Sequence, residues 1–454
     1  MAIQPIDSLR VALQFAEQAT PVGTLMRRAG RLLFEYDDDF LKGVAGQRLE
    51  LSPLHLPLKP GPMHFDAALF EGLPGVFDDS LPDGWGRLLI DRCLRQQGHL
   101  PQQFGPLERL AWVGTHGMGA LIYEVELGQD EAGPEASATF AHPLASLWPT
   151  HLTGAAHQAG RQAEHKAGQL AQAGLDRLAE HSQTLLAGHH SEVLAELIAL
   201  NGSSAGARPK AMVLANEDCS QLILSAEGDD PLTWPAGYRA WMVKFANQSD
   251  GPEAGAVEYL YQQMAQAAGL TVSPSHLFDQ AGGAGYFASQ RFDRHAGGRY
   301  HLHSVAGLLH SDFRVPALDY LDLAKATQLL TRDHRQLQQL FRLATFNVLA
   351  HNRDDHGKNF SFLMNASGQW HLAPAYDLTC SSGPGGEHST MVAGEGRDPS
   401  LDDLKRLAAA MTIDAAEAER IIDQCRQALS QWPSLAKGLG LSAETIAFVG
   451  RRLR

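Results

Sequence analysis

The chain has 454 residues, which is more than one simple hydrophobic core accommodates, so we expect two or three domains. A hydrophobic share of 44% with 19% charged residues is typical of a soluble globular protein, not of a disordered one. With 37 basic against 51 acidic residues, the formal net charge of −14 argues against broad binding of nucleic acid by the chain alone.

The cysteine pattern and the amino-terminal sequence indicate the compartment. Four cysteines lie far apart without a Cys-x-x-Cys pair, so neither a disulfide framework nor a zinc site is expected. The start of the chain has no basic segment followed by an apolar one, and no apolar run approaches about eighteen residues. We therefore expect a cytoplasmic protein that does not enter a membrane.

The first 128 residues predict a mixed, β-rich domain. A short strand is expected at 10–15 and a hairpin at 23–36 that turns at Ala29-Gly30, whereas residues 51–60 are too rich in proline for a regular element. A helix is expected from Trp85 to Cys93, where apolar residues recur at near-helical spacing. The three glycines within 114–123 are not followed by Lys-Ser/Thr, so we attribute them to tight backbone packing and not to a phosphate loop.

The next segment separates this domain from the rest of the chain. Residues 129–139 are polar and rich in turn formers, and they mark a domain edge. Residues 155–182 are rich in Ala, Gln, Gly and His with weak periodicity, which predicts an insertion or a loosely packed helix. A compact apolar helix is expected at 191–200.

A glycine-containing segment at 202–210 follows, joined to short strands expected at 211–214 and 221–224. Such a segment can lie over nucleotide phosphates, because exposed N–H groups and the missing Cβ of glycine permit close approach. An ordinary turn is the alternative. The candidate nucleotide-binding residues here are Gly202, Ser203, Ser204, Ala205, Gly206 and Lys210.

A single lysine, Lys244, lies among apolar neighbours in the strand expected at 240–245. A buried lysine is costly without a partner, and protein kinases pair such a lysine with a glutamate on the next helix. Glu258 is available in the helix expected at 253–270. The alternative is a lysine that extends to solvent and a solvated helix charge. A strand ending in a polar turn follows at 286–294, and its residues 288–292 are candidates for adenine contact.

The residues with the clearest chemistry lie at 349–377. Asp354, His356, Lys358 and Asn359 occur within six residues, and Asp377 follows a hairpin expected from strands at 360–364 and 370–373. Phosphotransferases need one Asp to accept the proton of the attacking hydroxyl, and an Asn and a second Asp to bind magnesium. In protein kinases the base and the metal-binding Asn lie five positions apart, as they do here. The pattern predicts a kinase.

Helical patterns dominate from residue 318 onward, at 320–330, at 336–349 and in three or four segments of 401–454. Residues 381–390 predict a flexible loop, where kinases carry their activation segment. Three histidines at 301, 303 and 310 suggest a metal cluster at first sight, but no further ligand lies at a fitting spacing.

With these residues in place, the sequence resembles the HipA family, bacterial serine/threonine kinase toxins of type II toxin–antitoxin modules. The most specific match combines residues 352–359 with residues 372–381. The glycine-containing segment and residues 291–294 are similar to further family segments, and residues 22–36 and 70–83 are similar to its smaller amino-terminal domain. The stretch at about 129–182 is poorly matched.

The resemblance implies roles by position. Asp354 would be the catalytic base, Asn359 and Asp377 would bind Mg²⁺, and Lys244, paired with Glu258, would contact phosphate. It places two further residues, Gln290 and Phe292, at the hinge beside the nucleotide, and we add His356 and Lys358 as candidates for nucleotide contact. Because an Asp-x-His-x-x-Asn loop also occurs in phosphoinositide-type kinases, the loop alone does not fix the acceptor.

The resemblance also implies regulation and partners. Autophosphorylation would fall on Ser203 or on Ser204, where a phosphate within a loop shaped for phosphates would repel ATP. Serines that merely cap a turn are the alternative. Family substrates include aminoacyl-tRNA synthetases, and the usual partner is a small HipB-like helix-turn-helix antitoxin, so that DNA would be contacted only indirectly.

We therefore expect an α+β, bilobal, protein-kinase-like fold with a β-rich amino-terminal domain and a mainly helical carboxyl-terminal lobe. The expected parts are an amino-terminal domain at 1–128, a linker or insertion at 129–190, a nucleotide lobe at 191–295 and a catalytic lobe at 296–454. The expected activity is ATP- and Mg²⁺-dependent phosphorylation of a protein serine or threonine. Alternatives are a small-molecule or lipid kinase, or a silent binding module such as a co-repressor, which would not need all four of Lys244, Asp354, Asn359 and Asp377.

Overall fold

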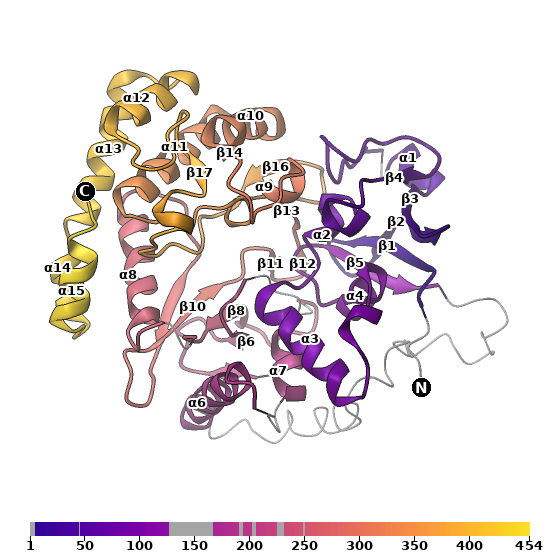
Figure 1. The fold of residues 1–454 in the computed structure, drawn as a ribbon, viewed down its shortest axis with the longest axis horizontal. Helices are drawn as coiled ribbons and strands as arrows, with labels where there is room; N and C mark the ends of the chain where they lie inside the picture. Colours follow the sequence, from indigo (N-terminus) through magenta and orange to yellow (C-terminus); the bar gives the residue numbers. More distant parts are fainter. Residues whose placement is uncertain are drawn as a thin grey trace.

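The computed structural model describes residues 5–44, 46–126, 167–189, 194–201, 206–224, 231–247 and 250–454. An amino-terminal sheet lies on one side of the molecule, and the carboxyl-terminal helices lie on the opposite side (Figure 1). A second sheet and two long helices, α8 and α11, lie between the two ends of the chain. The predicted domain boundaries after residues 128, 190 and 295 stay predictions.

The amino-terminal sheet has five antiparallel strands in the order β4-β3-β2-β1-β5. Alternate residues of β1 (Leu9, Val11 and Leu13) are buried, as expected of a strand with one face on the core. Ala29 and Gly30 both take positive φ, which suits the two-residue turn of a hairpin. The predicted strand and hairpin are therefore confirmed. The strands are β1 Ser8–Gln14, β2 Ala19–Arg28, β3 Arg31–Tyr36, β4 Met63–His64 and β5 Leu121–Val125.

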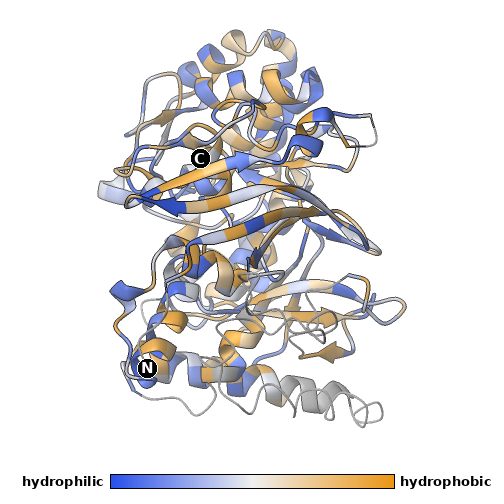
Figure 2. Ribbon diagram, turned by 90° about the vertical axis from the view of Figure 1, so that its right-hand side faces the viewer, coloured by the Kyte–Doolittle hydropathy of each residue, from blue (hydrophilic) through white to orange (hydrophobic). Residues whose placement is uncertain are grey.

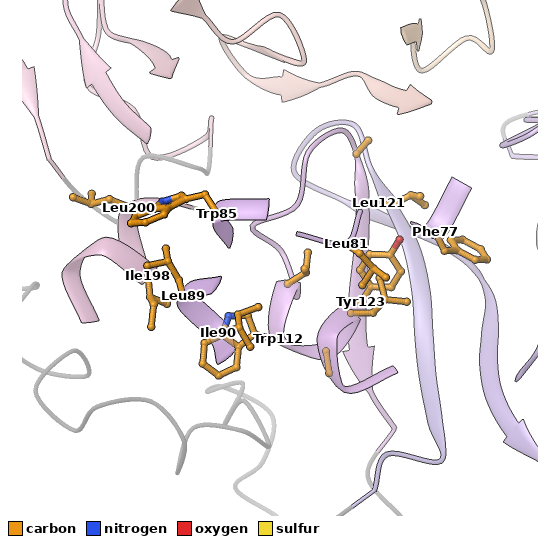
Figure 3. Packing of buried hydrophobic residues seen from close by; sticks show 14 of the residues in the cluster. Phe77, Leu81, Trp85, Leu89, Ile90, Trp112, Leu121, Tyr123, Ile198 and Leu200 are labelled. Carbon is orange, nitrogen blue, oxygen red and sulfur yellow. The ribbon is translucent and has the colours of Figure 1, made fainter. Parts of the chain in front are cut away.

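Short helices surround this sheet, and α3 is the one predicted from Trp85 onward. Figure 3 shows Trp85 beside Leu200 and Leu89 beside Ile198, so α3 packs on α7 (Leu194–Asn201). This packing places the start of α3 next to the segment that follows α7 in the chain. The helices are α1 Asp38–Lys42, η1 Phe70–Gly72, α2 Gly75–Asp78, α3 Gly84–Gln96, η2 Pro101–Gln103 and α4 Pro106–Val113.

The second sheet is antiparallel with the order β7-β6-β8-β10-β9, and α8 packs on β10 and β9. The predicted strands and the helix α8 are confirmed. The helix α6 (Ala167–Leu186) buries Leu175, Leu178 and Leu185, so the later part of the Ala/Gln-rich stretch is a packed helix. The other elements are β6 Lys210–Ala215, β7 Leu222–Ile223, β8 Arg239–Lys244, α8 Ala254–Ala267, β9 Ser275–Phe278 and β10 Tyr286–Gln290.

The remainder of the chain is mainly helical and contains a small sheet of order β13-β15-β16. The predicted hairpin is present as β15 and β16, and the ribbons of the helices carry both orange and blue residues in Figure 2, as amphipathic helices do. The elements are β11 Arg294–His295, β12 Gly298–Arg299, β13 His301–Ser304, α9 Val305–Leu308, β14 Leu318–Asp319, α10 Tyr320–Thr331, α11 His334–Leu349, η5 Gly357–Asn359, β15 Ser361–Met364, β16 Trp370–Leu372, η6 Pro384–Gly386, β17 Thr390–Met391, α12 Leu401–Ala410, α13 Ala415–Leu429, α14 Trp432–Gly438 and α15 Ala443–Gly450.

Two hydrophobic clusters fill the described part of the molecule. The first joins the amino-terminal sheet, α3, α7 and the second sheet, and it includes Leu9, Trp85 and Val243. The other joins α8 to the carboxyl-terminal helices through residues such as Tyr261 and Phe346. Because the amino-terminal domain shares its core with the second sheet, it packs as an integral part of that lobe.

A buried ion cluster joins the amino-terminal domain to residues 291–299. The Asp293 carboxylate is fully buried and accepts hydrogen bonds from Arg291 at 2.8 Å and from Arg294 at 2.7 Å. The same carboxylate accepts from the backbone N–H of Gly119 at 2.8 Å. A Cβ on Gly119 would meet the backbone nitrogen of Leu302 at 2.9 Å, which confirms that this glycine serves close backbone packing.

Glycines also bring backbones into close contact where α2 meets α9. A Cβ on Gly75 in α2 would collide with the carbonyl oxygen of Gly307 in α9, and a Cβ on Gly307 would meet a carboxylate oxygen of Asp79 at 2.6 Å. The two glycines therefore permit a close approach of α2 in the amino-terminal domain to α9.

The histidines of β13 and the loop after α9 belong to the same interface. His301 Nε2 lies 3.0 Å from the carbonyl oxygen of Leu51, and His303 contacts Asp79 at 2.6 Å. The backbone N–H of Gly75 donates to His310 Nε2 at 3.3 Å. Across the described ranges, no group of three or more His, Cys, Asp or Glu side chains is arranged to hold a metal ion.

We predict that Asp293→Asn lowers the free energy of unfolding by about 3–5 kcal/mol, because it leaves two buried guanidinium groups without their counter-charge. The control Asp312→Asn removes an exposed ion pair with Arg314 and should change stability by less than about 0.5 kcal/mol. Urea unfolding of the full chain measures both.

The pH dependence gives an internal check on this prediction. Burial alone would raise the pKa of Asp293, but the charges of Arg291 and Arg294 hold it at about 2, below the ordinary value of 3.8. The stabilisation is therefore complete above about pH 4 and disappears as the pH falls through about 2. A difference between wild type and Asp293→Asn that grew on acidification would contradict the assignment.

Candidate active site

The ammonium group of Lys244 is the centre of the candidate site. Lys244 is the last residue of β8, and its Nζ lies 2.5 Å from Oε1 of Glu258, a nearly completely buried residue of α8. The ring of Phe287 lies on one side of the ammonium, with 5.7 Å from Nζ to the ring centroid. A buried charge is tolerated only with a partner, and Glu258 is the partner that a lysine among apolar neighbours needs.

Asp377 binds the same ammonium group through Oδ1. It follows β16 and has left-handed backbone with φ 58, which aspartate tolerates better than most residues do. Burial would raise the pKa of Asp377, but the charge and hydrogen bond of Lys244 hold it well below its ordinary value. The carboxylate is therefore ionised at neutral pH and can coordinate a cation.

Arg208 was not among the sequence-based candidates, although it lies in the glycine-containing segment. Its guanidinium contacts Glu258 Oε2 at 3.0 Å and Asp250 Oδ2 at 3.0 Å. Glu258 thus accepts from both Arg208 and Lys244. The position of Arg208 between two other candidates, Gly206 and Lys210, is the sequence signal that could have identified it.

Lys210 lies beside Lys244 across the β6–β8 pair, in register with it. It is buried, and burial together with the positive charge of Lys244 lowers the pKa of Lys210 to about 8. Gly206 has φ +105, and a Cβ there would meet Nζ of Lys210 at 2.6 Å. The backbone of the glycine-containing segment at Gly206 therefore lies against this lysine. The other candidates in the segment, Gly202, Ser203, Ser204 and Ala205, lie outside the described residues.

The loop between α11 and β15 presents Asp354 at the surface. The amide Nδ2 of Asn359 donates to the carbonyl oxygen of Asp354 at 2.6 Å, which leaves its amide oxygen for another partner. Loss of hydration raises the pKa of Asp354, and the negative charge of Asp377 adds to the rise. A carboxylate with a raised pKa is the better proton acceptor.

The neighbouring Asp355 has a different environment. It is buried and accepts hydrogen bonds from the hydroxyl of Tyr320 at 3.0 Å and from the backbone N–H of Ser389 at 2.9 Å. His388 Nδ1 lies 3.0 Å from the same carboxylate. Asp355 thus joins the loop to α10 and to the segment before β17, while Asp354 remains exposed.

The remaining candidates lie around this centre. Lys358 pairs with two carboxylates of the amino-terminal domain, Asp83 at 3.1 Å and Asp78 at 3.8 Å. The ring of Phe313 lies 4.8 Å from the Lys358 ammonium and 5.2 Å from the ring of His356. Asp83 was not anticipated from the sequence.

The two hinge candidates occupy the end of β10 and the turn after it. Gln290 pairs with Trp241 of β8, and the ring of Phe292 lies 5.3 Å from the ring of Tyr376, the residue before Asp377. Both are partly buried. Gln290 ends the strand that neighbours β8 and Lys244 in the sheet, and Phe292 lies in the turn after it, which is compatible with contact to a nucleotide base.

A strand lysine paired with a helix glutamate, beside a mainly helical lobe that supplies two aspartates, defines a kinase-like α+β protein with a β-rich amino-terminal sheet. Two family models match the chain: the HipA N-terminal domain over residues 13–124 and the HipA-like C-terminal domain over residues 202–432. The chain belongs to the HipA family of toxin–antitoxin kinases.

Two solved structures are similar. The HipA toxin of Shewanella oneidensis MR-1, in a complex with HipB and its operator DNA, is 15% identical with a TM-score of 0.58, over 98% of this chain and 94% of that chain. The proinflammatory kinase CtkA of Helicobacter pylori is 13% identical with a TM-score of 0.33, over 47% of this chain and 88% of that chain. No curated protein sequence matches the chain. In the described part, no helix is long and apolar enough to cross a membrane.

The contrast between the two aspartates leads to a prediction about stability. Asp355→Ala should lower the free energy of unfolding by at least about 2 kcal/mol, since it leaves buried donors unsatisfied. Asp354→Ala should change it by less than about 0.5 kcal/mol, because the side chain is exposed. Thermal or urea unfolding compares the two variants, and equal losses would contradict the assignment of separate roles.

Proposed function

We propose that this protein is a serine/threonine-protein kinase that uses ATP and Mg²⁺ and phosphorylates another protein. The observation that carries the proposal is the Lys244 ammonium, which Glu258 and Asp377 share within one cluster. The same groups occur in phosphoryl-transfer sites, where a lysine contacts the phosphates and an aspartate binds the metal ion.

The residues fit a magnesium site. Asp377 offers an ionised carboxylate, and the amide of Asn359 is oriented by its bond to Asp354 with its oxygen left over. Mg²⁺ prefers such oxygen ligands, and when bound it would neutralise charge on the phosphate oxygens. The chain itself supplies positioning: Lys244 and Lys210 would contact phosphates, and Gln290 and Phe292 would contact the base.

Asp354 is proposed as the residue that accepts the proton of the attacking hydroxyl. It is exposed, it lies five residues before Asn359, and its raised pKa favours proton acceptance. Most of the rate enhancement would come from orientation and charge neutralisation, since phosphoryl transfer requires little covalent chemistry from the protein.

Partners are proposed by likeness. The similar Shewanella HipA is bound to HipB and operator DNA, and we propose that this chain also binds a small helix-turn-helix antitoxin. Its net charge of −14 supports contact with DNA through that partner and not through the chain alone. An aminoacyl-tRNA synthetase is the class of substrate to test first.

We predict that Asp354→Ala and Asp377→Ala each lower phosphate transfer at least about 1,000-fold, because each removes a group that transfer requires. Asp354→Ala should unfold as the wild type does, whereas Asp377→Ala should also lower the free energy of unfolding, because it leaves Lys244 with Glu258 as its remaining counter-charge. Labelled ATP with a protein lysate is the assay, and chelation of Mg²⁺ by EDTA should have the same effect. Parallel reactions with lipid and metabolite extracts test the other acceptors. Wild-type transfer by Asp354→Ala would overturn the assignment of the base.

Self-phosphorylation is a separate expected outcome. Intact mass spectrometry after incubation with Mg-ATP should find one added phosphate that maps to Ser203 or Ser204 and is missing in Asp354→Ala. The charge of about −2 on such a phosphate would repel ATP from the segment. A modification that also appears in Asp354→Ala would instead indicate phosphorylation by another kinase.

A further inference from the structure

Asp83, the residue before α3, makes contacts that the proposed reaction does not require of the amino-terminal domain. Its Oδ1 accepts a hydrogen bond from the backbone N–H of Gly206, and its Oδ2 accepts one from the ammonium of Lys358 at 3.1 Å. One carboxylate therefore contacts both Gly206 of the glycine-containing segment and the loop that carries Asp354 and Asn359.

Gly206 is bound to the start of α3 by both of its backbone groups. While its N–H donates to Asp83, its carbonyl oxygen accepts from the backbone N–H of Trp85 at 3.0 Å. Gly84 lies between these two contacts with φ +42, and a Cβ there would meet the Gly206 oxygen at 2.6 Å. Only glycine at position 84 permits this approach without displacement.

The position of α3 is itself fixed by packing. The side chain of Trp85 is almost completely buried, and Trp85 and Leu89 lie against Leu200 and Ile198 of α7 (Figure 3). The helix α7 ends at Asn201, shortly before Gly206 in the chain. The amino-terminal domain therefore contacts both the helix before the glycine-containing segment and Gly206 in the middle of that segment.

The second contact leads to the metal-binding candidates. Lys358 precedes Asn359, and its carbonyl oxygen accepts from the hydroxyl of Tyr376 at 2.6 Å. Tyr376 in turn precedes Asp377. The position of Lys358 is thus coupled through two adjacent backbone units to both Asn359 and Asp377.

The electrostatics agree with this geometry. Burial would raise the pKa of Asp83, but the charge of Lys358 and the N–H of Gly206 hold it below its ordinary value. The other carboxylate near Lys358 differs, since burial raises the pKa of Asp78 to about 6. Both carboxylates are mainly ionised at neutral pH, and Asp83 is the closer partner of Lys358, at 3.1 Å against 3.8 Å for Asp78.

We infer that Asp83 is a positioning residue of the active site, which places the glycine-containing segment for nucleotide binding through Gly206 and the catalytic loop for transfer through Lys358. The inference rests on the proposed kinase activity. It assigns the amino-terminal domain a direct part in the arrangement of the site. The two contacts should affect different kinetic parameters, because one orders a nucleotide-binding segment and the other orders the metal-binding loop.

The test compares Asp83→Asn, Asp83→Ala and Lys358→Met. Asn retains an acceptor for the Gly206 N–H but loses the charge, so we expect kcat to fall about tenfold with the KM for ATP within about twofold. Ala loses both contacts, so the KM for ATP should also rise about tenfold. Lys358→Met should reproduce the Asn variant, and the double variant Asp83→Asn/Lys358→Met should be no slower than either single one.

Asp91→Asn is the matched control, because Asp91 lies on the same helix and has none of these contacts. It should leave both parameters within about twofold of wild type. Rates are referred to nucleotide sites titrated with a fluorescent ATP analogue, so that unfolded protein does not lower kcat. A merely structural role would change the number of titrated sites but not the KM for ATP.

Two results would overturn the inference: an unchanged KM for ATP in Asp83→Ala, or independent, multiplicative effects of Asp83→Asn and Lys358→Met on kcat. If Asp83→Ala does not fold, the comparison of kcat among Asp83→Asn, Lys358→Met and the double variant still tests the inference. If the wild type transfers no phosphate, the proposed function fails by itself. The inference is then judged by affinity for the ATP analogue, which should be weaker in Asp83→Ala than in Asp83→Asn.

Discussion

The buried ammonium of Lys244 is the constraint on which the site depends. Removing an amine cation from water costs several kcal/mol, so β8 can end in this lysine only where counter-charges are already in place. Those charges come from α8 and from the segment after β16, which belong to different parts of the chain. The ion cluster therefore forms only when the second sheet, its helix and the helical lobe have assembled, and the fold and the site require each other.

The amino-terminal domain is part of this assembly and not an appendage. It shares a hydrophobic core with the second sheet. It also contacts the buried ion cluster in which the Asp293 carboxylate pairs with Arg291 and Arg294. The contacts of Asp83 extend the same domain to the edge of the site. In the described structure, the amino-terminal domain, the second sheet with α8, and the helical lobe therefore pack around the charged residues near Lys244.

Local signals made much of this predictable. The β2–β3 hairpin follows from Ala29-Gly30 between alternating residues, and the separation of Asp354 from Asn359 identified the exposed aspartate beside the buried Asp355. These features depend on neighbours in the sequence, where periodicity and spacing carry information. Three or four helical segments were predicted at 401–454 for the same reason, and the helices α12 to α15 are present there.

What the sequence did not disclose are contacts between distant residues. Asp83 and Gly206 are 123 positions apart, and their bond exists because α3 packs on α7. His301 resembled a metal ligand, yet its partner is a backbone carbonyl at Leu51. Arg208 lay within a predicted segment, but its carboxylate partners on and before α8 are set by tertiary packing. The residue type alone does not reveal whether a carboxylate or an imidazole will contact a ligand, a main-chain atom or another side chain.

The glycine pair at positions 75 and 307 has a mechanical consequence. With no side chain between the two backbones, the contact resists any closer approach of α2 to α9. The hydrogen bond from Gly75 to His310 at the same point opposes their separation. A side chain at position 75 or 307 would push the two segments apart, so we expect both positions to exclude every residue but glycine.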